Sequence, residues 1–156
     1  MLYGYLIENK ALLQESILDR FKRKKKKYQE LPSTPKVKVT DPEKRKEELS
    51  LVQSIVKSVL SKYNNPKGIE LYDNEEEDIN NFLDGTDKYI HILSWDAWEG
   101  TDNRARSEEY YRPFEEILEK IWKEIDNQIK NNSNLHGMTE IDADWDDGYM
   151  NYILYH

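Results

Sequence analysis

The chain has 156 residues, a formal net charge of −8 and no cysteine. This length favours one domain with its own core, and the lack of cysteine excludes disulfide scaffolds and thiolate metal sites. No apolar run approaches the roughly 18 residues that a membrane span needs. The apolar run in Met1–Ile7 is too short for a signal peptide. We therefore expect a cytoplasmic protein that does not bind membranes.

The charge is divided unevenly along the chain. Residues 1–66 contain 15 Lys and Arg against 8 Asp and Glu, a balance of +7, whereas residues 67–156 contain 8 against 23, a balance of −15. We expect a single α+β domain over residues 1–156, with a basic, mainly helical half at 1–66 and an acidic α/β half at 67–156. Such asymmetry favours a charged partner, because each half attracts groups of opposite sign.

The basic half predicts two helices. Residues 2–7 fit an opening strand, and Asn9 fits a cap for a helix that runs into the basic segment at residues 20–27. A second helix follows the capping box Thr40–Glu43 with its early proline. Its apolar residues recur at helical spacing: Leu49, Val52, Ile55, Val56, Val59, Leu60 and Tyr63.

The acidic half alternates strand and helix signals. Gly68–Asp73 alternates as a strand does, and Asn74–Glu77 is a capping signature for a short helix with Phe82 inward. Lys88–Trp95 predicts a further strand, followed by an irregular stretch, and Trp95 is a candidate core residue.

The longest apolar stripe predicts another helix. Its members are Phe114, Ile117, Leu118, Ile121, Trp122, Ile125 and Ile129. Pro113 either begins this helix or lies inside one that begins near Ser107. The elements together predict a mainly antiparallel sheet of about four to five strands, with three to four helices packed on it and a C-terminal β-hairpin.

The hairpin is predicted from the stretch Thr139–His156. Asp147-Gly148 is a two-residue turn signal, because a type I′ turn needs positive φ at both central residues. Pairing across this turn places Asp142 opposite Ile153. Side chains on strands alternate between faces, which predicts a core face of Ile141, Ala143, Trp145, Met150, Tyr152 and Leu154. The other face points outward and holds Glu140, Asp142, Asp144, Asp146, Tyr149, Asn151, Ile153 and Tyr155.

The alternating acids do not match a calcium loop. Counting from Asp142, the sixth position is Asp147 instead of glycine, and the twelfth is Ile153 instead of an acid. The sequence contains no phosphate-binding loop, dinucleotide fingerprint or nucleophile elbow. We therefore predict no metal site and no cofactor, and we expect a binding protein in preference to an enzyme.

The outward face of the hairpin has two interpretations. Its acids could be gatekeepers that prevent aggregation through the sheet edge. They could also form a recognition surface, because carboxylates select a basic partner and tyrosines supply contact area. The second interpretation predicts a small acidic inhibitor of the immunity, antitoxin or anti-defence type, which covers a basic surface on a nuclease toxin or a host defence effector. Its predicted partner-binding residues are Glu140, Asp142, Asp144, Asp146, Tyr149, Tyr155 and Trp98.

Two other functions remain open. A metal-dependent nuclease or nucleotide-processing enzyme would use acids at strand ends, here Asp73, Glu75, Glu76, Glu77, Asp78, Asp84, Asp87, Asp96, Glu99 and Asp102. A nucleic-acid-binding accessory protein would use the basic segment, with Lys22, Arg23, Lys24, Lys25, Lys26 and Lys27 on phosphates. That segment has seven cations in eight positions but no base-reading signature.

Overall fold

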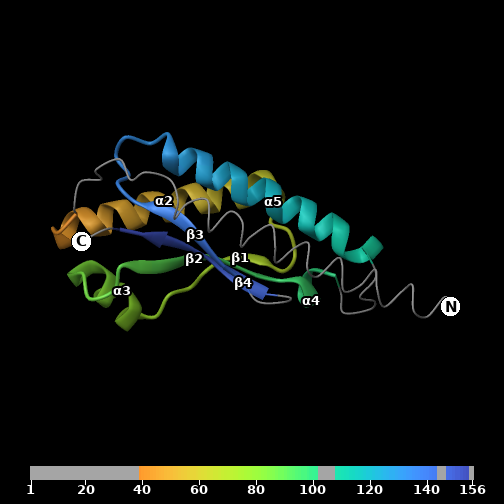
Figure 1. Ribbon diagram of the computed structural model, residues 1–156, viewed down its shortest axis with the longest axis horizontal. Coiled ribbons are helices and arrows are strands. Elements are labelled where there is room, and N and C mark those ends of the chain that lie inside the picture. Colours follow the sequence, from red (N-terminus) through yellow and green to blue (C-terminus); the bar gives the residue numbers. More distant parts are fainter. Residues whose placement is uncertain (1–38, 102–107, 144–146, 155–156) are drawn as a thin grey trace.

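The computed structural model describes residues 39–101, 108–143 and 147–154 (Figure 1). It confirms the predicted α+β class, with a four-stranded antiparallel sheet in the order β1-β2-β4-β3. The strands are β1 Ile69–Leu71, β2 Tyr89–Asp96, β3 Met138–Ala143 and β4 Asp147–Ile153. The predicted strand at 2–7, the helix from Asn9 and the basic segment at 20–27 lie outside the described residues.

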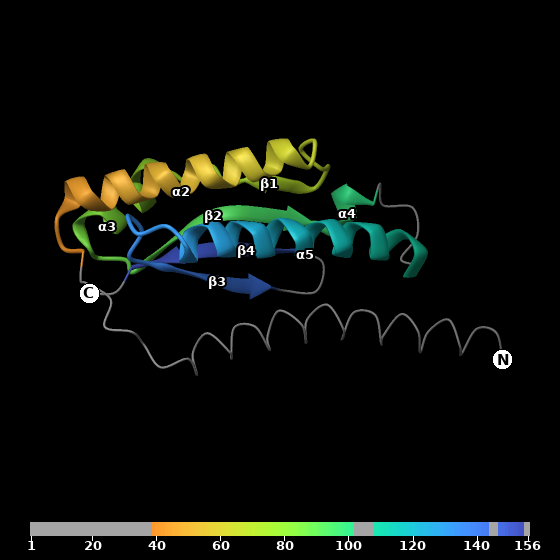
Figure 2. The ribbon, with the colours of Figure 1, turned by 90° about the horizontal axis from the view of Figure 1, so that it is seen from above.

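Two long helices cover one face of the sheet (Figures 1 and 2). Helix α2 is Pro42–Lys62, and Asp41, not Thr40, caps it by accepting a hydrogen bond from the Glu43 backbone N at 3.0 Å. Helix α5 is Glu108–Lys130 and has Pro113 inside it, which decides between the two predicted starts. None of the described helices combines the length and apolar character that crossing a membrane requires.

Two shorter helices flank β2. Helix α3 is Glu76–Asp84; its N-cap is Glu75, so the predicted cap at Asn74 is wrong. The Asn74 side chain instead donates to the His91 carbonyl at 2.8 Å, which ties the start of α3 to β2. The stretch after β2 is not irregular as predicted, because Asp96 caps the single-turn helix α4, Ala97–Gly100.

The core lies between the sheet and helices α2 and α5. Both predicted apolar stripes point into it, and Trp95 is buried as expected. Burying each such side chain stabilises the fold by about 1.5–3 kcal/mol. The most deeply buried members include Val52, Val56, Leu93, Leu118, Ile121, Ile125, Met150 and Tyr152.

Arg45 is a fully buried cation that joins three segments at one end of the sheet. Its guanidinium donates to the backbone carbonyls of Phe82, of Val39 at 3.0 Å and of Asp87 at 3.2 Å. Burial lowers the Arg45 pKa, while the nearby acids Glu48 and Asp84 favour the charged guanidinium. These hydrogen bonds hold Val39 beside the start of β2.

The hairpin register differs from the predicted one. Ala143 pairs with Gly148 and Asp142 with Tyr149, so the predicted turn at Asp147-Gly148 is wrong. Both residues of that dipeptide lie in β4, where Asp147 pairs with Asp96 and Gly148 with Trp95 of β2. The two registers differ by four residues. Because four is even, the side chains keep their predicted faces.

Candidate functional site

The candidate site is the face of the sheet turned away from α2 and α5, which we call the outer face. The strand register places four side chains in one row across it: Glu70 on β1, Ser94 on β2, Tyr149 on β4 and Asp142 on β3. A second row contains His91, Asn151 and Glu140. The outer face therefore draws side chains from all four strands, and not only from the hairpin.

A β-bulge in β2 gives the outer face its composition. The register shifts between His91 and Leu93, so Ile92 is an extra residue in this strand. His91 before the bulge and Ser94 after it can therefore both lie on the outer face, while Ile92 and Leu93 are both buried. The bulge lies between two halves of the outer face, one aromatic and one acidic.

The charged strand residues of the outer face are all acidic, apart from His91. The four strands contain five carboxylates and no lysine or arginine: Glu70, Asp96, Glu140, Asp142 and Asp147. Asp96 and Asp147 are direct cross-strand partners. Like charges in that position reduce stability. The Asp96 carboxylate also caps α4, since it accepts from the Trp98 backbone N at 2.9 Å, and this role alone could account for an acid at that position.

The aromatic half is centred on His91. Its ring stacks on Tyr149 with 4.5 Å between centroids, and Tyr72 meets it edge-on at 4.9 Å. The rings of Tyr72 and Tyr149 are 5.6 Å apart, and Tyr89 lies 5.7 Å from His91. Tyr89 and Tyr149 are 49% and 38% exposed. Packed rings with exposed edges offer a large contact area at little further entropy cost.

A hollow of about 230 Å³ lies over the acidic half. Its walls combine carboxylates with tyrosine rings: Glu70, Asp96, Glu99, Asp147, Tyr72 and Tyr149. This combination suits the cationic head and apolar stem of a Lys or Arg side chain.

The described residues include only some of the predicted partner-binding residues. Asp142 and Tyr149 are exposed on the outer face, Glu140 is half-buried there, and Trp98 is half-buried in α4. Asp144, Asp146 and Tyr155 lie outside the described residues, as does Trp145 of the predicted core. Two outward-face residues are less exposed than expected: Ile153 is half-buried, and Asn151 is buried with its Oδ1 against Nδ1 of His91.

Several outer-face residues were not among the predicted partner-binding residues. Glu70, Tyr89 and His91 lie in β1 and β2, and Tyr72 directly follows β1; both strands are remote in sequence from the hairpin. The alternation in Gly68–Asp73 and Lys88–Trp95 indicated which side chains would share a face. It did not indicate that these strands lie next to β4.

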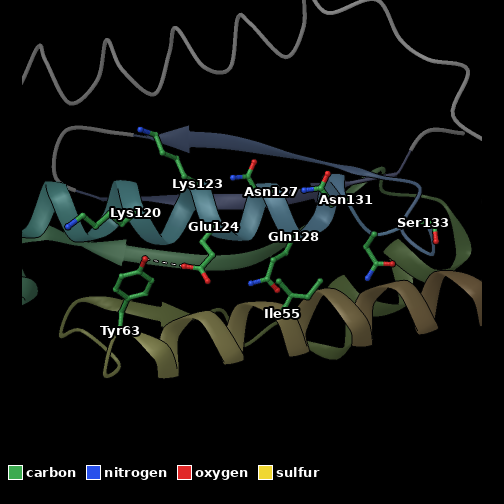
Figure 3. Close-up of a pocket in the computed structure, with 10 residues that line it drawn as sticks. Ile55, Tyr63, Lys120, Lys123, Glu124, Asn127, Gln128, Asn131 and Ser133 are labelled. Carbon is green, nitrogen blue, oxygen red and sulfur yellow. Dashed lines mark hydrogen bonds between the residues drawn. The ribbon is translucent and has the colours of Figure 1, made fainter.

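A larger groove of about 800 Å³ lies between α2 and α5, on the helical side of the molecule (Figure 3). Glu124 accepts hydrogen bonds from Tyr63 Oη at 3.0 Å and Lys62 Nζ at 2.8 Å, which link the two helices. The other lining residues are mostly amides and lysines, including Asn127, Gln128 and Lys120. The groove is wide and mixed in charge, so its lining is explained by a solvated helix pair.

The acids proposed for a metal-dependent enzyme are spread over several elements. Asp73 follows β1, Glu76 and Asp78 begin α3, and Asp96 ends β2. Hydrogen bonds from the Thr86 side chain and from the Thr86 backbone N, the latter at 2.8 Å, lower the Asp84 pKa. Asp102 lies outside the described residues. Within the described ranges, no three His, Asp or Glu side chains come together as metal ligands would.

No protein-family model, curated protein or solved structure matches this chain.

Proposed function

We propose that this protein is a small acidic inhibitor that binds a basic surface of a partner protein through its outer face. The supporting observation is one continuous sheet face with five strand carboxylates, no strand lysine or arginine, and exposed Tyr89 and Tyr149. The inhibitor would act by steric occlusion. Surfaces that bind phosphate backbones are basic, so a nuclease toxin or a nucleic-acid-binding defence effector is the partner class that fits best.

The chemistry of the face favours a protein partner over a nucleic acid. Carboxylates repel phosphates, whereas they pair with lysine and arginine on a protein. Tyrosines beside the acids supply the apolar area that most protein interfaces need near their centre. Asp142 and Tyr149, direct cross-strand partners, place both kinds of group side by side.

The outer face of the sheet is smaller than the area that a stable interface buries on each partner. The four strands have 3, 8, 6 and 7 residues. At about 3.3 Å per residue and about 4.8 Å between strands, they give a face of roughly 380 Å². A stable complex buries about 800 Å² on each partner. Groups around the sheet must therefore contribute, and α4 is well placed because Glu99 lines the hollow next to Asp96. This position keeps Trp98 as a candidate anchor at the rim.

A matched pair of charge variants tests this proposal. The face variant changes Asp142 and Asp147 to Asn and Glu70 to Gln; the control changes Glu43, Glu47 and Glu116, exposed acids on α2 and α5, to Gln. Both remove three negative charges. In affinity capture from the native host, we expect a basic partner to bind the wild type and the control and to be lost from the face variant.

The captured partner is then assayed for its own activity, which the wild type should block and the face variant should not. The proposal is wrong if the face variant captures and inhibits that partner as well as the wild type does.

A further inference from the structure

The basic segment at residues 20–27 has a charge opposite to that of the outer face of the same chain. It carries seven Lys and Arg in eight positions. The strands of the outer face carry five carboxylates and no lysine or arginine. Opposite charges of this density attract each other unless the chain prevents them from meeting.

The position of Val39 allows them to meet. Val39 is buried, and Arg45 holds its carbonyl beside Asp87, two residues before β2. The intervening residues 28–38 can span up to about 36 Å when extended. Because β2 is about 26 Å long, this tether reaches from its start to the acids at its far end.

We infer that residues 20–27 dock on the outer face and mask it until a partner displaces them. This inference concerns the chain alone and goes beyond the proposed function, which does not require a mask. Lysine and arginine head groups of the segment would lie against Glu70, Asp142 and Asp147. The segment would then act as an internal competitor with the same chemistry as the partner's basic surface.

The tether makes such competition effective. A linker of this length gives an effective concentration on the order of 1 mM. If the free segment binds the face with a Kd of about 0.1 mM, the mask weakens the binding of an external basic ligand about tenfold. Weak intrinsic affinity is therefore sufficient, and the mask remains displaceable.

Zero-length crosslinking of the full chain tests the docking directly. A carbodiimide joins a lysine amine to a carboxylate only where the two are in contact. We expect monomer crosslinks between lysines of segment 20–27 and Glu70, Asp142 or Asp147. They should be lost at high salt and in the face variant, but not in the control changed at Glu43, Glu47 and Glu116.

Binding of an octalysine peptide to the full chain gives a second measurement. One variant changes Lys24, Lys25 and Lys26 to Gln, and its control changes the exposed Lys44, Lys46 and Lys57 of α2 to Gln. Both have the same net charge. We expect the first variant to bind octalysine about fivefold more tightly than the control, because a weakened mask competes less.

Three results would overturn the inference: equal octalysine binding by these two variants, segment crosslinks only to helix acids, or crosslinks only between different copies of the chain. The experiments distinguish a failure of this inference from a failure of the proposed function. If the crosslinks are absent but partner capture still depends on Asp142 and Asp147, only the inference about the mask is rejected. If the crosslinks form but the face variant captures the partner as well as the wild type does, only the inhibitor proposal is rejected.

Discussion

Gly148 shows how the meaning of one residue depends on its tertiary neighbours. The dipeptide Asp147-Gly148 is a strong local turn signal, yet Gly148 is a buried strand residue opposite Trp95. A Cβ added to Gly148 would lie 2.4 Å from Trp95 Cζ2 and 2.8 Å from the Asp142 carbonyl oxygen. Glycine is therefore required here by the tryptophan ring and the adjacent strand, and not by a turn.

Substitutions at Gly148 distinguish the two roles. A type I′ turn accepts asparagine readily, whereas the space beneath Trp95 accepts no side chain. We expect Gly148→Ala to lower the free energy of unfolding by about 1–3 kcal/mol and Gly148→Asn to lower it at least as much. Urea denaturation measures both, with the exposed neighbour Asp147→Asn as the control. Full stability of Gly148→Asn would support the turn and contradict the observed register.

At the scale of elements, the helices were predictable and the neighbours within the sheet were not. The apolar stripes of α2 and α5 are periodic over about four turns each, so sequence alone defines their buried sides. The hairpin faces were also predictable, because an even register error leaves them unchanged. The order β1-β2-β4-β3 depends on contacts between remote segments, which explains why Glu70, Tyr72, Tyr89 and His91 were missed.

The link between α2 and α5 predicts a pH-dependent contribution to stability. Hydrogen bonds from Lys62 and Tyr63 lower the Glu124 pKa below its ordinary 4.5, and Glu124 raises the Lys62 pKa above 10.5. Stability from a depressed acid pKa is present above the unfolded value and lost as pH falls through the folded one. Stability from the raised Lys62 pKa is lost only at strongly alkaline pH.

We therefore expect Glu124→Gln to lower Tm by roughly 2 °C at pH 7. The wild type and the variant should converge as the pH falls below 4.5 and through the lowered pKa of folded Glu124. Thermal unfolding followed by circular dichroism across this range measures the difference, and Glu116→Gln on the exposed side of α5 is the control. A difference that persists after Glu124 has been protonated would show that packing, and not charge, is responsible.

At the scale of the whole molecule, the acids of the outer face are part of the net charge of −15 that residues 67–156 carry. A field of one sign over a flat surface speeds the approach of an oppositely charged protein and holds it in the correct orientation. The proposed inhibitor would therefore obtain much of its advantage from rapid association.

For the captured partner, we expect the association rate to fall about tenfold between roughly 50 and 500 mM NaCl, while the dissociation rate changes much less. Surface plasmon resonance or stopped-flow fluorescence measures both rates. The face variant should show a shallower salt dependence than the variant changed at Glu43, Glu47 and Glu116. Equal slopes for the two variants would mean that the total charge, and not the outer face, directs the encounter.

The extra residue Ile92 in β2 also limits how such a protein could diversify. Exchanging Tyr89, His91 or Ser94 would change the chemistry offered to a partner and leave the strand intact. Deleting Ile92 would restore a regular strand and leave Trp95 and Asp96 on their present faces, but it would remove a buried apolar side chain and the local twist that the bulge gives β2. Relatives that evolved against new partners should therefore vary the identities of these side chains while the length of β2 stays fixed.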